Sequence, residues 1–125
     1  MKNLIIDAAN EKIIFSIISN LESYTTSHIN SRENFDKFVN LLIDFLEKSK
    51  TKLEDIDNLF INQGPGKFTG IRISIAVAKA ITISSNINLY GFNSKDFENN
   101  EYEKILELHK KGLLIKDLIK PLYSS

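Results

Sequence analysis

Hydrophobic and polar residues follow a period of two at the start of the chain. Two runs rich in β-branched residues, 3–7 and 12–18, flank a short turn at 8–11, which is the pattern of a β-hairpin. The run 22–26 carries strand-forming residues with a more polar face, as expected near the edge of a sheet. The chain is therefore predicted to open as a three-stranded antiparallel meander.

A helical period replaces this alternation after residue 29. We expect Asn30 to cap a helix, with Glu33 reaching back to complete a capping box. Apolar residues then recur at the spacing of a helix that lies on a core, at Phe35, Phe38, Val39, Leu42, Phe45 and Leu46. Leu41 and Ile43 lie beside this stripe. They widen the apolar face enough to allow a second packing partner.

The second half of the chain alternates between strands and helices. The predicted elements are a short helical turn at 53–56, a strand at 58–62, a helix at 69–83, a strand at 87–92, a helix at 101–111 that ends at Gly112, and a short further helix within 113–119. The helix at 69–83 is apolar on nearly every side. We therefore expect it to be buried on more than one side, with a partner protein on one of them.

This order of elements predicts an α/β fold of the actin-like or ribonuclease H-like type. We expect a mixed five-stranded sheet with helices packed on it, and a right-handed crossover that places the fourth strand parallel to the first. The length of 125 residues fits a single domain. Residues 1–93 are predicted to form the actin-like N-terminal domain, and 94–125 a helical C-terminal segment and tail.

Composition excludes several classes of function. The chain has no Cys, which removes disulfides, thiolate metal sites and cysteine nucleophiles. Its formal net charge is zero, so it has no basic excess to hold a nucleic-acid backbone by itself. We find no signal peptide and no apolar run of membrane-spanning length, and expect a cytoplasmic protein without a membrane partner.

A glycine-containing turn joins the strand at 58–62 to the apolar helix. Its residues are Gly64, Pro65, Gly66, Lys67 and Gly70. We expect Gly64 and Gly66 to take backbone angles closed to other residues. The spacing fits neither a P-loop nor the dinucleotide-binding fingerprint. The residues leave two interpretations open: a tight strand-to-helix turn, or an anion site that uses Lys67 and Arg72 at the helix N-terminus.

The run from Gly64 to Ile73, followed by Ala76, Ala78 and Lys79, resembles the signature of the bacterial TsaB (YeaZ-like) family. The resemblance extends to the strand ending in Asp7, to 89–92 and to 121–123. It implies an actin-like ATPase fold and a part in making the threonylcarbamoyladenosine modification of tRNA. Family members carry a second domain before the C-terminal tail, where this chain has only 93–120, so we expect a member shortened to about one domain.

Catalytic residues, metals and cofactors are not expected. Asp7 ends the first strand, but Ala8 and Ala9 stand where the superfamily has polar residues that contact phosphate. The fourth strand ends in Asn62 and Gln63, so no second carboxylate faces Asp7 for a two-metal site. We expect Asp7 to be structural. The alternative is a small ATPase or phosphotransferase that binds phosphate at the glycine turn and magnesium at Asp7.

Small residues at helical spacing from Ser74 to Ala80 favour a helix-on-helix contact over a ligand pocket. The resemblance implies that the first helix and the signature helix meet TsaD, the homologous catalytic subunit. The predicted interface consists of Phe35, Phe38, Leu42, Phe68, Thr69, Ile71, Arg72, Ile75, Ala78 and Lys79. We expect a heterodimer with a TsaD-like subunit, an interaction with a TsaE-like ATPase, a homodimer through these helices when the chain is alone, and only indirect contact with tRNA.

Overall fold

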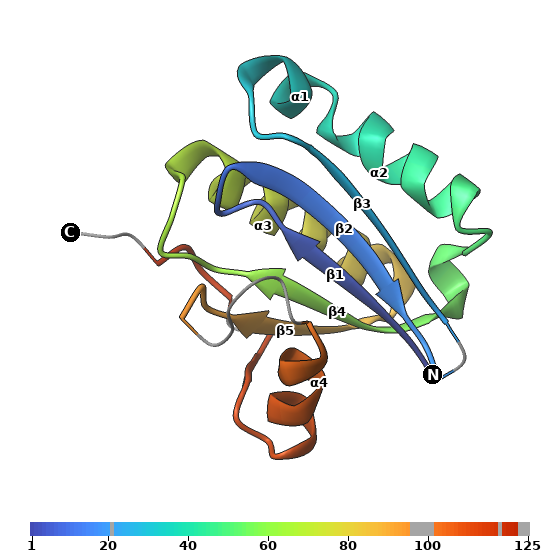
Figure 1. Cartoon of the computed structure of the whole chain (residues 1–125). Helices are drawn as coiled ribbons and strands as arrows, with labels where there is room; N and C mark the ends of the chain where they lie inside the picture. The colour runs from blue at the N-terminus through green and yellow to red at the C-terminus, as the bar shows by residue number, and fades with distance from the viewer. Residues whose placement is uncertain (21, 96–101, 118, 123–125) are drawn as a thin grey trace.

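A computed structural model describes residues 1–20, 22–95, 102–117 and 119–122. The described strands form one mixed sheet in the order β3-β2-β1-β4-β5-β6 (Figure 1). Their bounds are β1 (Lys2–Asp7), β2 (Lys12–Ile18), β3 (Ser23–Ile29), β4 (Ile56–Asn62), β5 (Asn88–Phe92) and β6 (Ile115–Lys116). β1, β2 and β3 are antiparallel neighbours, and β4 is parallel to β1. The predicted meander and the parallel pairing of the fourth strand with the first are confirmed.

Helices cover both faces of the sheet. They are α1 (Arg32–Asp36), α2 (Phe38–Lys48), α3 (Phe68–Ser85) and α4 (Glu103–Lys110), with a short 3₁₀ helix, η1 (Leu53–Asp55). Figure 1 shows α3 behind the sheet and α4 on the opposite side. Leu4 and Ile6 of β1 pack with the α1–α3 layer, whereas Ile5 packs with α4. Successive strand residues point to opposite faces, so a strand buried on both faces is a continuous apolar run.

The C-terminal segment differs from its prediction. Residues 115–116 form a sixth strand antiparallel to β5, with Ile115 opposite Gly91, rather than a further helix. The reason is the turn at Gly112, whose φ of 71° ends α4 and sends the chain back along the open edge of β5. Backbone hydrogen bonding to that edge outweighs the local helical pattern.

The first predicted helix is capped and divided differently. Ser31, not Asn30, is the N-cap, because its hydroxyl accepts the Asn34 N–H at 3.3 Å. The Asn30 amide instead donates to the carbonyl oxygens of Ala8 and Asn10, at 3.0 and 2.6 Å. Lys37 then separates α1 from α2. A long-range contact has therefore taken the side chain that local sequence assigned to capping.

Helix α3 buries one face within this chain, not several. That face consists of Gly70, Ile71, Ser74, Ile75 and Ala78. By length and composition α3 is the one helix, among the described residues, that is long and apolar enough to cross a membrane, so the expectation that no run reaches such a length was wrong. A core helix meets the same criterion. Because α3 packs on the sheet as the crossover between parallel β4 and β5, we interpret it as a core helix.

Candidate functional site

The glycine turn packs directly against the turn between β1 and β2. A Cβ atom on Gly66 would overlap the carbonyl oxygen of Ala9, and one on Gly70 would overlap that of Ala8. Gly64 has a φ of 103°, but Gly66 is outside the left-handed region. The expected special backbone angle is thus confirmed for Gly64 and wrong for Gly66. Gly66 is required because two backbone segments approach closely.

The same contact occupies the place proposed for an anion. The Lys67 N–H donates to the Ala9 carbonyl at 2.7 Å, and the Lys67 ammonium pairs with Glu11 at 3.3 Å. The guanidinium of Arg72 lies over the Phe68 ring, 5.0 Å from its centroid. Both cations therefore have protein partners, and an anion at this turn would face carbonyl oxygens. Of the two interpretations, the geometry favours the packing turn.

Asp7 is the centre of a buried polar cluster at the carboxyl ends of β1 and β4. Its carboxylate accepts the Asn62 amide at 2.9 Å and the Tyr102 hydroxyl at 2.8 Å. The side-chain oxygen of Asn62, Oδ1, accepts hydrogen bonds from the Gly64 N–H at 2.8 Å and from the Ser94 hydroxyl at 3.3 Å. The cluster therefore links the first strand, the glycine turn and the start of α4.

Burial raises the pKa of Asp7 above its ordinary value, although the hydrogen bonds from Asn62 and Tyr102 oppose this shift. Burial and the nearby Asp7 charge also raise the pKa of Tyr102. Both carboxylate oxygens already have protein donors. The Asp7 carboxyl group is therefore held in place by Asn62 and Tyr102.

These residues do not fit the nucleotide and magnesium that an actin-like ATPase would hold. Magnesium sites use carboxylate oxygens together with phosphate and water, whereas Asp7 is buried and bonded to Asn62 and Tyr102. Ala8 and Ala9 supply no hydroxyl groups. In the described parts of the chain, no three His, Cys, Asp or Glu side chains gather closely enough to hold a metal ion.

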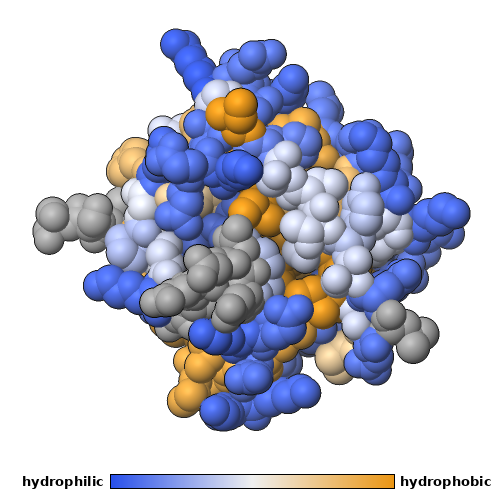
Figure 2. Space-filling view, in the orientation of Figure 1, coloured by the Kyte–Doolittle hydropathy of each residue, from blue (hydrophilic) through white to orange (hydrophobic). Residues whose placement is uncertain are grey.

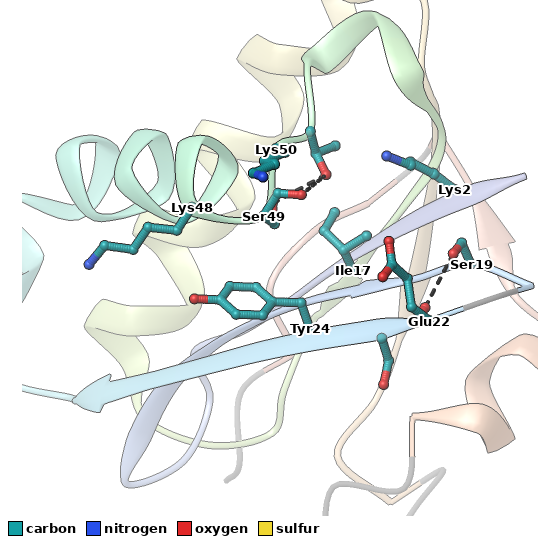
Figure 3. A pocket seen from close by; sticks show the side chains of 10 residues that line it. Lys2, Ile17, Ser19, Glu22, Tyr24, Lys48, Ser49 and Lys50 are labelled. Atoms are coloured by element: carbon teal, nitrogen blue, oxygen red, sulfur yellow. Dashed lines mark hydrogen bonds between the residues drawn. The ribbon is translucent and has the colours of Figure 1, made fainter.

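A polar cavity of about 310 Å³ lies at the other end of the sheet, where α2 ends beside β2 and β3 (Figure 3). Lys2, Lys48, Lys50 and Glu22 line it. Lys48 forms an ion pair with Asp44 at 2.9 Å, and Figure 3 shows Lys48 and Lys2 at opposite sides of the cavity. The free carbonyls at a helix C-terminus attract cations. The lysines therefore complement the end of α2, and we assign no anion site here.

An apolar groove separates α2 from α3. Its cavity is about 310 Å³, and we call its lining the α2–α3 groove: Val39, Leu42, Ile43, Leu46, Leu53, Val77, Ala80, Ile81 and Ser84. Val39 and Ile43 are 51% and 49% exposed. By contrast, the face that carries α4 is mostly hydrophilic, with small separated hydrophobic areas (Figure 2). Large exposed apolar surfaces mark interaction sites, so the groove is the candidate binding surface.

The structure divides the predicted interface into two groups. Phe38, Leu42, Ile71, Ile75 and Ala78 are buried in the core of this chain, and of these five only Leu42 also lines the α2–α3 groove. The second group is exposed or partly exposed: Phe35, Phe68, Thr69, Arg72 and Lys79.

The sequence pattern did not separate the two groups, because an apolar residue can pack on the chain's own sheet as well as on a partner. Ile43, which lies beside the predicted stripe, was the sequence signal for the groove. Val77 and Ile81 complete it across α3, and they carried no signal beyond the uniform hydrophobicity of that helix.

Known proteins are similar to this chain in both sequence and fold. The family model described as TsaD: tRNA N6-adenosine threonylcarbamoyltransferase matches residues 21–97, more than half of the chain. The chain belongs to this family. Within it, the chain is TsaB/YeaZ-like, as the resemblance in the signature turn predicted.

Two curated relatives carry the name tRNA threonylcarbamoyladenosine biosynthesis protein TsaB. The protein of Buchnera aphidicola subsp. Schizaphis graminum is 30% identical over 91 residues, which cover 73% of this chain and 43% of the relative. That of Escherichia coli K12 is 29% identical over 94 residues, covering 75% and 41%. The matched part of the chain therefore spans less than half the length of these TsaB proteins.

Solved structures confirm the fold. YeaZ from Pseudomonas aeruginosa superposes with a TM-score of 0.67 at 20% identity, covering 74% of this chain and 43% of YeaZ. RuvC of T. thermophilus, solved with a Holliday junction substrate, gives 0.51 at 8% identity, covering 90% and 78%. The predicted actin-like, ribonuclease H-like fold is confirmed, with six described strands in place of five.

Gly66→Ala should destabilise this TsaB/YeaZ-like fold by about 1–3 kcal/mol, because the added methyl group must displace the Ala9 carbonyl in a packed junction. Denaturation by urea measures the loss. Gly112→Asn is the matched control, because no other atom lies within 4 Å of a Cβ built there and Asn tolerates positive φ. Wild-type stability in Gly66→Ala would show that the two turns are not closely packed.

Asp7→Asn should reveal a pH-dependent contribution of the buried carboxyl group. Its pKa is raised in the folded state, so the folded state holds the proton more tightly than the unfolded chain, whose pKa is about 3.9. The stability that Asp7 contributes is fully present below that pH and is lost as pH rises through the folded-state pKa. We expect the unfolding free energy of wild type minus that of Asp7→Asn to fall over this window. Urea titrations at several pH values measure it, and a rising difference would contradict the raised pKa.

Proposed function

We propose that this chain is a non-catalytic scaffold subunit in the biosynthesis of threonylcarbamoyladenosine in tRNA, and that it binds a TsaD-like catalytic subunit through the α2–α3 groove. The names of the TsaB relatives support the pathway. The observation that carries the proposed binding is the groove itself, because one of its walls is the helix that follows the signature turn.

The shape and chemistry of the groove favour an α-helix of the partner. Two helices form its walls, and aliphatic side chains line it almost throughout, with Ser84 as the one hydroxyl. Amphipathic helices bind such grooves with apolar residues at helical spacing. Each fully buried Val or Ile side chain contributes about 1.5–3 kcal/mol. Val39 and Ile43, half-exposed at the rim, have the most to gain from a partner.

Three features support a role without independent catalysis. The Asp7 carboxylate is buried and already bonded, the glycine turn faces Ala8 and Ala9 carbonyls, and the net charge of zero gives no general attraction for tRNA. In this proposal the chain acts in the cytoplasm, meets tRNA only through the TsaD-like subunit, and also contacts a TsaE-like ATPase.

Ile43→Glu should abolish the complex with the TsaD-like subunit while the chain stays folded. The half-exposed side chain tolerates a carboxylate in the free protein, but the complex would bury it without a partner. This costs several kcal/mol, enough to weaken a micromolar complex by roughly 100-fold or more. Titration calorimetry with the purified TsaD-like subunit measures the affinity, and circular dichroism checks the fold.

Leu113→Glu is the matched control, because Leu113 is 65% exposed and follows α4 on the other face of the sheet. It should bind like wild type. Equal binding by wild type and Ile43→Glu would exclude the groove as the interface.

Asp7→Ala separates the scaffold from the alternative of a small ATPase or phosphotransferase. In a reconstituted tRNA-modification assay, activity should be lost with Ile43→Glu and largely kept with Asp7→Ala, because only the first variant prevents assembly. Micromolar ATP binding that disappears in Asp7→Ala would favour the alternative. Loss of modification in an assembled Asp7→Ala complex would show that this subunit contributes chemistry.

A further inference from the structure

The exposed side of helix α3 carries positive charge only. The sequence of α3 contains no Asp or Glu, and its two charged residues are Arg72 and Lys79. Both side chains belong to exposed residues. Among the described residues, the ion pairs join other side chains, and no carboxylate pairs with Arg72 or Lys79. The charge on this side of α3 is therefore not compensated within the described chain.

A hollow of about 410 Å³ surrounds Arg72 on the N-terminal half of α3. We call it the Arg72 hollow, and its lining consists of Phe68, Thr69, Arg72, Ile73 and Ala76. This lining includes no acidic side chain. Lys79, by contrast, lines a different hollow together with Asp117, so that cation shares its surroundings with a carboxylate of the same chain. Arg72 is thus the cation of α3 with room for a carboxylate from a partner.

The Phe68 ring restrains the Arg72 side chain in this hollow. The guanidinium carbon lies 5.0 Å from the ring centroid, within the distance of about 6 Å that is typical of a cation–π contact. The contact forms because residues four positions apart are neighbours on a helix surface. A long side chain that is already restrained loses less conformational entropy when it binds. Arg72 is therefore well prepared for an intermolecular contact.

The Arg72 hollow continues the α2–α3 groove along the same helix. Ile73 and Ala76 line the hollow, and Val77 and Ala80, each four residues further along α3, line the groove. From Arg72 to Ser84, which also lines the groove, α3 rises ~18 Å at about 1.5 Å per residue. A partner helix of roughly three turns is long enough to cover both.

We propose that the helix which the TsaD-like subunit places in the α2–α3 groove extends to the Arg72 hollow and sets an Asp or Glu side chain on the Arg72 guanidinium. This inference rests on the proposed function. A guanidinium presents its N–H donors as a planar fork that matches the two oxygens of a carboxylate. Complementary charge of this kind gives specificity and fixes register. Arg72 therefore determines which apolar helix the groove accepts.

Charge complementarity selects an acidic helix over other helices. A basic helix would bring a second cation against Arg72, which costs free energy because like charges repel. A wholly apolar helix would cover the guanidinium without supplying an acceptor, and a buried unpaired charge is also costly. Only a carboxylate lets the partner cover the apolar lining of both hollows and satisfy the cation between them.

Arg72→Gln tests the carboxylate, with the full chain and the purified TsaD-like subunit in titration calorimetry. It should bind at least ~10-fold more weakly than wild type, because the partner's carboxylate then loses its cation. Arg72→Lys keeps the charge but loses the fork, and its affinity should lie between the two. Lys110→Gln is the matched control, because it removes one positive charge from an exposed residue of α4, on the other face of the sheet. It should bind like wild type.

Circular dichroism should be unchanged in all three variants, because the substituted residues are exposed. Equal binding by Arg72→Gln and wild type would overturn the proposal. Together with lost binding in Ile43→Glu, that result would leave the groove as the interface and exclude the carboxylate. A wild-type chain that does not bind the TsaD-like subunit would exclude both.

A charge exchange identifies the residue of the partner. Arg72→Glu should weaken the complex by roughly 100-fold or more, because two carboxylates then meet. Each Asp and Glu in the helices of the TsaD-like subunit is changed to Lys in turn. One of these changes should restore binding to Arg72→Glu while weakening binding to wild type. If none of them restores binding, the proposal is wrong.

Discussion

The close contact between two turns is the constraint on which the rest of this structure depends. The backbone of the glycine turn lies against the Ala8 and Ala9 carbonyls so closely that neither Gly66 nor Gly70 has room for a side chain. This contact fixes the carboxyl ends of the parallel strands β1 and β4 and the direction in which α3 leaves the sheet. It also places carbonyl oxygens at the glycine turn, where the sequence alone left an anion site open.

The buried Asp7 cluster extends the same junction to the C-terminal part of the chain. A carboxyl group in such a place is costly unless its oxygens are bonded, and here Asn62 and Tyr102 provide the donors. Tyr102 comes from the start of α4, so the carboxylate joins that helix to the first strand.

The apolar residues of α2 and α3 are divided between the sheet and the α2–α3 groove. Each helix presents one arc to the sheet and a second to the groove, and this explains why helices so rich in aliphatic residues are incompletely buried. The α2–α3 groove is thus the candidate surface for association.

Local pattern determined much of this protein. Alternation in 3–7 and 12–18 gave the hairpin, and the run from Gly64 to Ile73 gave the turn, the helix and the family, because these features depend on neighbours in sequence. Tertiary structure decided the rest. Asn30 left its predicted cap for a carbonyl 22 positions away, residues 115–116 joined a strand edge, and Ile75, a residue of the predicted interface, is buried in the core. In each case the same side chain or backbone group could form either a local contact or a long-range one. Only the folded chain brings the long-range contact within bonding distance.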